Sequence, residues 1–349
     1  MKIHQKQSKT LTQTSYMNLE IVVQSNCPTN WNKNLLNSKL GNIHQTKEYG
    51  EFVKNRLKSE PLYVKFHNKK GDTVGQVLLV QSFKGRGRLS EVFGRGFVFS
   101  TVGKFSKFLS KHYMWKSGPV IFNDDYKTEI IESFGNLLVS WKDGFSGSFH
   151  PLNHDMDFPE KFRFKRSKLA TFIIDLRNDL REILKKTDKK SVQKNIERSQ
   201  ERGVTVTEIQ SEKDLLVYYE LQKQHRLKSN VSPYLWKDVV EWYNVLRPIG
   251  DKGLLAWYGE IPVGGILFST FNGYINESGI ARSRLDAEKK LYAQDLLRWN
   301  IIEWGYRNNC RYYDLTGVKL ENRSPKEEGI FRNKKKWGGK LHEYYIFQK

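Results

Sequence analysis

The order of strand-like and helix-like segments between residues 170 and 347 constrains the fold more than any other feature of the sequence. Residues 170–175 form an apolar run typical of a buried strand, and residues 311–315 form another. Residues 259–262 read Gly-Glu-Ile-Pro between two strand-like runs, which predicts a hairpin. Apolar residues recur at helical spacing between residues 293 and 304. Strands that alternate with helices in this way predict an α/β (α+β) fold.

The same patterns predict the remaining elements of both halves. In the second half we expect helices at 180–186, 190–202, 214–226 and 235–246, and strands at 204–209, 274–279 and 342–347. In the first half we expect helices at 45–57 and 128–141, a hairpin of 62–66 with 74–80, a strand at 113–121, and an edge strand or loop at 147–151.

The length of the chain predicts two domains. A chain of 349 residues with 38% hydrophobic and 13% aromatic residues can bury two cores. We expect an irregular N-terminal leader at 1–30, a first domain at 31–165 and a second domain at 166–349. The last strand, at about 341–348, is a candidate to pair back to the first domain.

Residues 311–339 combine an aromatic strand, a turn and a lysine cluster. Asp314 ends the strand, a Thr-Gly turn at 316–317 follows, and a polar loop leads to Lys334, Lys335 and Lys336. Adjacent ammonium groups beside Trp and two glycines favour an anionic or acyl-phosphate-like partner, because glycine lets backbone N–H groups approach a ligand closely. The alternative is a solvated basic loop.

The chain is strongly basic. Its formal net charge is +21 and its isoelectric point is near 9.7. Fourteen Lys or Arg residues stand against six Asp or Glu residues between 161 and 202. Such clustering favours a polyanionic partner, such as RNA, a nucleotide-linked substrate or anionic lipid headgroups, over a general excess of lysine.

Cysteine, histidine and apolar residues give no sign of a metal, a disulfide or a membrane span. Cys27 and Cys310 have neither metal-site nor disulfide spacing, and the histidines are scattered. No apolar run approaches the roughly 18–20 residues that span a bilayer, and the N-terminus lacks an apolar signal core. We expect a cytoplasmic protein without a cofactor, with peripheral contact to an anionic membrane as an open alternative, and we favour a monomer.

Two segments bear on whether acyl-CoA binds. Residues 84–88, Lys-Gly-Arg-Gly-Arg, superficially resemble a pyrophosphate loop, but Gln81 is one residue too far away and no helix pattern follows, so we expect a basic hairpin loop. In the second half, residues 280–286 lack a glycine pair, and their side chains would block the backbone approach that a pyrophosphate needs.

Three motifs of the second half lie at residues 191–206, 312–317 and 329–339. Together they resemble the FemABX-type family of GNAT-like aminoacyltransferases, which build peptidoglycan cross-bridges. Residues 191–206 resemble its Arg-x-Asn-Ile-x-Lys-Ala helix followed by Lys-Gly-Val-x-Val. Residues 312–317 resemble Tyr-Asp-Leu-Gly-Gly, and residues 329–339 resemble Gly-Leu-x-x-Phe-Lys-x-x-Phe-Gly-Gly. The resemblance covers the second half and implies two tandem GNAT-like acyltransferase domains around a central cleft. No heptad pattern is sustained, so it points to a subtype without the coiled-coil arm.

The sequence departs from the family pattern at several positions. Asn333 stands where the family has Phe in its Phe-Lys pair, unless Phe331 and Arg332 take that place. Ser191 and Lys194 stand where members often carry Arg.

The resemblance implies transfer of an amino acid from aminoacyl-tRNA to the amine of a nucleotide- or lipid-linked cell-wall precursor. It implies that Lys334 or Lys335 stabilises the oxyanion or the leaving ribose oxygen, and that Asp314 accepts a proton or orients a lysine or the amine. The expected substrate-binding residues are Lys54, Arg226, Tyr234, Tyr274, Arg332, Trp337 and Gly338. Two alternatives remain: an acyl-CoA-dependent N-acyltransferase and a non-catalytic RNA- or polyanion-binding protein.

Overall fold

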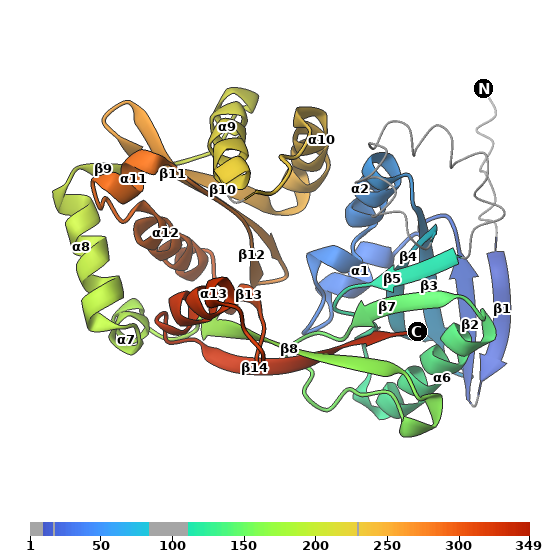
Figure 1. The fold of residues 1–349 in the computed structure, drawn as a ribbon. Coiled ribbons are helices and arrows are strands. Elements are labelled where there is room, and N and C mark those ends of the chain that lie inside the picture. Colours follow the sequence, from blue (N-terminus) through green and yellow to red (C-terminus); the bar gives the residue numbers. More distant parts are fainter. Residues whose placement is uncertain (1–9, 17, 84–110, 229) are drawn as a thin grey trace. The chain divides into compact units, whose positions relative to one another are not determined.

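The chain forms two compact units, each of which is described separately from a computed structural model. The structure describes residues 10–16, 18–83, 111–228 and 230–349 (Figure 1). Unit 1 lies within Met1–Lys168 and Tyr344–Lys349, and unit 2 is Leu169–Glu343. The loop expected at 84–88 lies outside the described residues. Among those described, no helix is long and apolar enough to cross a membrane.

Unit 1 is a mixed sheet with helices against it. Its strands lie in the order β1-β2-β3-β4-β5-β7, followed by the end of β14, and β6 pairs with β4. The strands are β1 (Thr10–Tyr16), β2 (Leu19–Gln24), β3 (Glu60–His67), β4 (Thr73–Phe83), β5 (Lys111–Trp115), β6 (Val120–Ile121) and β7 (Gly144–Ser148). The helices are α1 (Trp31–Leu36), η1 (Ile43–Gln45), α2 (Lys47–Leu57), η4 (Asp124–Tyr126), α6 (Lys127–Ser140) and η5 (Glu160–Phe162).

The first hairpin of unit 1 is confirmed, and two other expectations are corrected. Gly71, with φ +84°, turns the chain between β3 and β4. Residues 1–30 are not an irregular leader throughout, because β1 and β2 pair there, and alternate residues of β2 (Leu19, Ile21, Val23) enter the core. The strand expected at 147–151 is not at an edge, because β7 pairs with β5 on one side and with β14 on the other.

Unit 2 is also built on mixed parallel and antiparallel strands. Its strands lie in the order β9-β10-β11-β12-β13-β8, and β14 follows β8. The strands are β8 (Lys165–Asp175), β9 (Val204–Glu208), β10 (Asp251–Tyr258), β11 (Ile261–Phe271), β12 (Tyr274–Arg282), β13 (Tyr312–Val318) and β14 (Lys340–Gln348). The helices are α7 (Leu180–Lys186), η6 (Lys189–Gln193), α8 (Lys194–Glu201), α9 (Glu212–Lys228), α10 (Trp236–Leu246), η7 (Arg247–Ile249), α11 (Arg284–Glu288), α12 (Ala293–Arg307) and α13 (Pro325–Lys335).

Helices cover both faces of the unit 2 sheet (Figure 1). On one face, α8 and α12 pack over a core that includes Ile196, Leu297, Phe268 and Trp337. On the other face, α9 and α10 pack over a smaller core built around Tyr218. The helices and strands expected in this half are present. The segment expected as one helix at 190–202 begins as a π-helix, η6, and continues as α8.

Two adjacent parallel strands of unit 2 diverge, and this fork positions the candidate site. β12 and β13 pair over three residues only, from Tyr274 opposite Tyr312 to Asn276 opposite Asp314. Beyond Asn276, β12 continues beside β11, whereas β13 continues beside β8. Asp314 is therefore the last residue of β13 that is paired with β12.

The polar loop expected before the lysine cluster is a helix, α13. Ser324 and Glu327 form a capping box, with Pro325 at the first helical position. These helix-start signals are present in the sequence, so the prediction of a polar loop at this place was wrong. The helix matters because it fixes the direction of each lysine in the cluster.

Candidate active site

Asp314 is the centre of a buried hydrogen-bond network at the fork. Asp314 is only 4% exposed to solvent. Oδ1 accepts hydrogen bonds from the Thr171 hydroxyl and from the Thr316 backbone N–H, the latter at 2.7 Å. Oδ2 accepts a hydrogen bond from the Tyr274 hydroxyl at 2.7 Å. Donors from β8, β12 and β13 therefore hold this carboxylate in one position.

A β-bulge follows Asp314 and carries backbone strain. The pairing of β13 with β8 shifts register between Asp314 and Gly317. Thr316, in the bulge, has φ +63°, a left-handed conformation that a β-branched residue rarely adopts. Such strain costs on the order of 1–3 kcal/mol and persists only where surrounding contacts enforce it. Bulges of this kind re-aim side chains and are frequent beside active sites.

Lys334 supplies those enforcing contacts from α13. Its Nζ donates to the Thr316 carbonyl oxygen at 3.2 Å, to the Thr316 hydroxyl at 3.3 Å and to the Gly317 carbonyl oxygen at 3.3 Å. The residue is 8% exposed. Burial lowers the pKa of Lys334, and the nearby Arg298 charge lowers it further, while Glu277 and Asp314 oppose the shift. Asp314 and Lys334 thus hold the same strained residue from two sides.

A buried ion pair adjoins the lysine. Arg298 of α12 donates to both carboxylate oxygens of Glu277 on β12, at 2.8 and 2.9 Å. The Tyr313 hydroxyl also donates to Glu277, at 2.8 Å, and Arg298 donates to the Asn333 side-chain oxygen at 2.6 Å. Burial opposes ionisation of Glu277, but the charges of Arg298 and Lys334 hold its pKa below the usual value.

The sequence-based prediction missed this ion pair. Glu277 and Arg298 each interrupt an apolar pattern: Glu277 lies in a strand with Ile275, and Arg298 lies beside Leu297 on a mostly apolar helix. The sequence does contain a signal for this pair: a negative residue and a positive residue stand at inward-facing positions of two elements that could pack together. Asn333 accepts a hydrogen bond from the Arg298 member of this ion pair.

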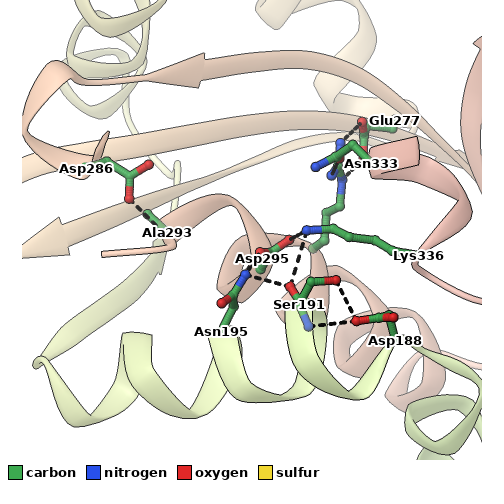
Figure 2. Close-up of polar contacts among 10 residues, drawn as sticks. Asp188, Ser191, Asn195, Glu277, Asp286, Ala293, Asp295, Asn333 and Lys336 are labelled. Carbon is green, nitrogen blue, oxygen red and sulfur yellow. Dashed lines mark hydrogen bonds and ion pairs between the residues drawn. The ribbon is translucent and has the colours of Figure 1, made fainter. Parts of the chain in front are cut away.

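A second polar junction joins three helical segments of unit 2 (Figure 2). Asp295, in the first turn of α12, accepts hydrogen bonds from Lys336 at 2.7 Å and from Asn195 of α8 at 2.8 Å. Lys336 also donates to the backbone oxygen of Ser191 at 3.4 Å. The lysine cluster is therefore divided: Lys334 faces the bulge, Lys336 donates to η6 and α12, and Lys335 is exposed.

The predicted site residues fall into separate groups. Asp314, Tyr274 and Lys334 meet at the fork. Arg226 and Tyr234 contact each other elsewhere in unit 2, with the guanidinium carbon 4.2 Å from the ring centroid, and Arg226 also donates to the Ser232 carbonyl oxygen at 2.8 Å.

Four further predicted residues have other surroundings. Arg332 is exposed on α13, 3.9 Å from the Glu328 carboxylate. Trp337 is fully buried in the core. Gly338 has φ +72°, and a Cβ there would lie 2.3 Å from the Lys186 carbonyl oxygen, so close backbone packing explains this glycine. Lys54 belongs to unit 1, exposed on α2 and 4.0 Å from Glu60.

The first backbone N–H of α12 is bound by a carboxylate of the protein itself. Oδ1 of Asp286, a fully buried residue, accepts the backbone N–H of Ala293 at 2.9 Å (Figure 2), and Arg282 donates to the other carboxylate oxygen. A free helix N-terminus attracts phosphate, but here a carboxylate takes that place. Within the described ranges, no group of three or more His, Cys, Asp or Glu residues is arranged to hold a metal ion.

Comparison by sequence gives no match, whereas comparison by structure does. No protein-family model matches the chain, and no curated protein matches its sequence. The crystal structure of FemX matches with a TM-score of 0.67 and 13% identity, covering 92% of this chain and 96% of FemX.

Two further solved structures match over most of their length. The C-terminal domain of a putative lysylphosphatidylglycerol synthetase from Agrobacterium fabrum has a TM-score of 0.52 and 8% identity, covering 90% of this chain and 92% of that domain. A tandem GNAT protein from the clavulanic acid biosynthesis pathway has a TM-score of 0.50 and 11% identity, covering 95% of this chain and 97% of that protein. The expected tandem GNAT-like fold and its resemblance to the FemABX type are confirmed at the level of the fold.

Proposed function

We propose that this chain, which shares the fold of FemX, is an aminoacyltransferase. It moves an amino acid from aminoacyl-tRNA to the amine of a nucleotide- or lipid-linked cell-wall precursor or a similar acceptor. The observation that carries the proposal is the meeting of Asp314, Tyr274 and Lys334 at the fork between β12 and β13. These three residues were selected from the sequence, and together they fix a strained bulge.

The proposed reaction forms an amide and breaks an ester. The neutral acceptor amine attacks the ester carbonyl carbon, negative charge develops on the acyl oxygen, and the C–O bond to the ribose then breaks. The amine loses a proton, and the ribose oxygen gains one. A fixed positive charge in a buried site stabilises such developing charge far better than a solvated one.

Lys334 is assigned this electrostatic role. Because its ammonium group already donates to three oxygens of the bulge, it acts as a fixed charge and holds the bulge in shape. Asp314 is a positioning residue, since three donors orient its carboxylate. Lys335 and Arg332, both exposed on α13, are assigned to the phosphates of the donor.

The remaining assignments concern the acceptor. Arg226, stacked on Tyr234 in unit 2, offers a guanidinium and an aromatic face, which suit a nucleotide diphosphate. Lys54, exposed in unit 1, is assigned separately to an anionic group of the acceptor. Trp337 and Gly338 are assigned to packing rather than to substrate contact, because the core and the Lys186 backbone explain them. We place the reaction in the cytoplasm, where aminoacyl-tRNA is available, without a cofactor and with a single copy of the chain.

The α12 N-terminus favours aminoacyl-tRNA over acyl-CoA as the donor. The Asp286 carboxylate occupies the Ala293 N–H and would repel a pyrophosphate at that place. Residues 280–286 also lack the glycine pair that close backbone approach requires.

A donor comparison tests the proposal. The protein is incubated with a mixture of labelled aminoacyl-tRNAs or with labelled acetyl-CoA, each with a panel of amine acceptors that includes murein precursors. We expect label to move only from aminoacyl-tRNA. Transfer from acetyl-CoA alone would establish the acyl-CoA alternative, and RNA binding without transfer from either donor would support the non-catalytic alternative.

A further inference from the structure

One row of cations runs along the surface of η6 and α8. Lys190, Lys194, Arg198 and Arg202 recur at every fourth residue, and all four are exposed. Residues four apart lie on the same side of a helix, so the row spans about 18 Å at 1.5 Å per residue. We call these four residues the α8 ridge.

The ridge is unfavourable for folding. Like charges at this spacing destabilise a helix. Within the described part of the chain, none of the four forms an ion pair, although Glu197 and Glu201 are exposed on the same helix. The helix is anchored from its other side by Val192 and Ile196, which enter the core. Cations that weaken the helix and form no ion pair with a carboxylate among the described residues point to an external anion.

The C-terminal end of the ridge is preorganised. The guanidinium carbons of Arg198 and Arg202 lie 6.0 and 5.4 Å from the ring centroid of Tyr292. Arg202 also donates to the backbone oxygen of Lys290, in a turn where Lys289 and Lys290 are exposed. Guanidinium groups held in place lose less entropy on binding phosphate, and their planar forks fit its oxygens.

We propose that the α8 ridge binds the sugar–phosphate backbone of an RNA strand. A line of evenly spaced cations matches a linear polyanion. A membrane-surface helix adds apolar anchors between its cations, whereas the apolar residues of η6 and α8, Val192 and Ile196, are buried. In this respect the ridge fits RNA better than an anionic bilayer.

Hydrogen bonds connect the helical segments that carry the ridge with the residue that follows α13. Ser191 and Asn195, from the turns that carry the ridge, are tied to Asp295 and Lys336 (Figure 2), and Lys336 lies two residues after Lys334. The inference rests on the proposed function in one respect: it takes the bound RNA to be the aminoacyl-tRNA donor, whose acceptor end must reach the fork.

Binding of deacylated tRNA as a function of salt tests the ridge. The test variant carries Lys190→Gln, Lys194→Gln, Arg198→Gln and Arg202→Gln. The matched control carries Lys69→Gln, Lys70→Gln, Lys213→Gln and Lys237→Gln, which removes equal charge at exposed positions outside η6 and α8. We expect the ridge variant to lose at least about tenfold in affinity, and its log–log salt slope to fall by about 3, at roughly 0.7–0.9 per phosphate contact. We expect the control to change the slope by less than about 1.

Two outcomes would overturn the inference. Equal losses in both variants would show that net charge, not the ridge, binds RNA. Loss of binding to vesicles of phosphatidylglycerol and phosphatidylcholine, with tRNA binding retained, would assign the ridge to a membrane.

The transfer assay separates this inference from the proposed function. Ridge-dependent tRNA binding without any amino-acid transfer would refute the function and leave the ridge in place. Transfer from subsaturating aminoacyl-tRNA at equal rates by wild type and ridge variant would refute the ridge and leave the function in place.

Discussion

Unit 2 contains two sets of cations with opposite surroundings. Arg298 and Lys334 are buried, and each is held by carboxylate, carbonyl or hydroxyl oxygens. The cations of the α8 ridge are exposed and form no ion pair among the described residues. The two sets lie on elements of one unit and are linked through the Asp295 junction.

The difference separates cations that maintain structure from cations available to a partner. Removing one member of a buried ion pair typically costs about 3–5 kcal/mol, because the other charge remains buried without compensation. Exposed charges contribute about 0–1 kcal/mol to stability. Buried cations should therefore report on folding and chemistry, and ridge cations on binding.

The largest expected effect is a loss of stability when the buried ion pair between Arg298 and Glu277 is broken. Arg298→Met leaves Glu277 buried without its ion-pair partner, and we expect the free energy of unfolding to fall by about 3–5 kcal/mol in urea titrations. Arg332→Met is the matched control, since Arg332 is exposed on α13, and we expect a change within about 0.5 kcal/mol. Equal effects of the two substitutions would remove the distinction between buried and exposed cations.

The next effect concerns the hydrogen bonds to Asp314. Tyr274→Phe removes one donor to a carboxylate, an interaction worth about 1.5–3 kcal/mol, so we expect the transfer rate to fall by at least about tenfold. Tyr312→Phe is the control, because that ring lies 6.1 Å from the Tyr274 ring and is outside the network. A Tyr274→Phe enzyme with unchanged rate would exclude Asp314 orientation from the chemistry.

The lowered pKa of Lys334 predicts opposite pH trends for activity and stability. If its charge stabilises the reaction, the transfer rate falls as pH rises between the lowered folded pKa and the ordinary value of 10.5. Over the same interval the unfolded chain binds more protons, so the contribution of Lys334 to the unfolding free energy rises.

Rates corrected for spontaneous ester hydrolysis provide the measurement. Lys334→Arg should move the alkaline limb to higher pH, because arginine stays charged. An alkaline limb that does not move would indicate that another group titrates.

The smallest effect is expected for the ridge. Replacing its four cations with Gln removes three like-charge pairs, each destabilising by about 0.2–0.5 kcal/mol, but it also removes the contacts of Arg198 and Arg202 with Tyr292, so we expect the free energy of unfolding to change by about 1 kcal/mol or less. Urea titration at low salt measures it, with the control variant beside it. A clear loss of stability would show that the ridge contributes to folding.

The local patterns of the sequence predicted most helices and strands but not the surroundings of every side chain. The hairpin of β10 and β11 and the helix α12 followed from turn residues and periodicity. The prediction of an irregular leader was wrong. The alternation of apolar and polar residues that marks β2 as a strand is short, because it spans only Leu19 to Val23. Helix α13 was not predicted, because the polar residues around Gly329 indicate a loop, whereas only the capping box at Ser324 indicates a helix.

The candidate site was only partly predictable, because its contacts join residues far apart in sequence. Thr171 and Asp314, and likewise Glu277 and Arg298, meet only after β8, β12, β13 and α12 assemble. The sequence motif selected three adjacent lysines, but the rotation of α13 decides that Lys334 is buried and Lys335 exposed. The motif predicted which segment of the chain contributes to the candidate site. Packing determines which lysine of that segment is buried and which is exposed.

Single-turnover transfer of labelled amino acid from saturating aminoacyl-tRNA, by Lys334→Gln and Lys335→Gln variants of equal folded fraction, tests the central claim most directly. We predict that Lys334→Gln slows transfer by about 10²–10³-fold, as expected for loss of a preorganised charge, and that Lys335→Gln changes the rate only a few-fold. Equal rates in the two variants would contradict the assignment of the buried fork as the site of acyl transfer.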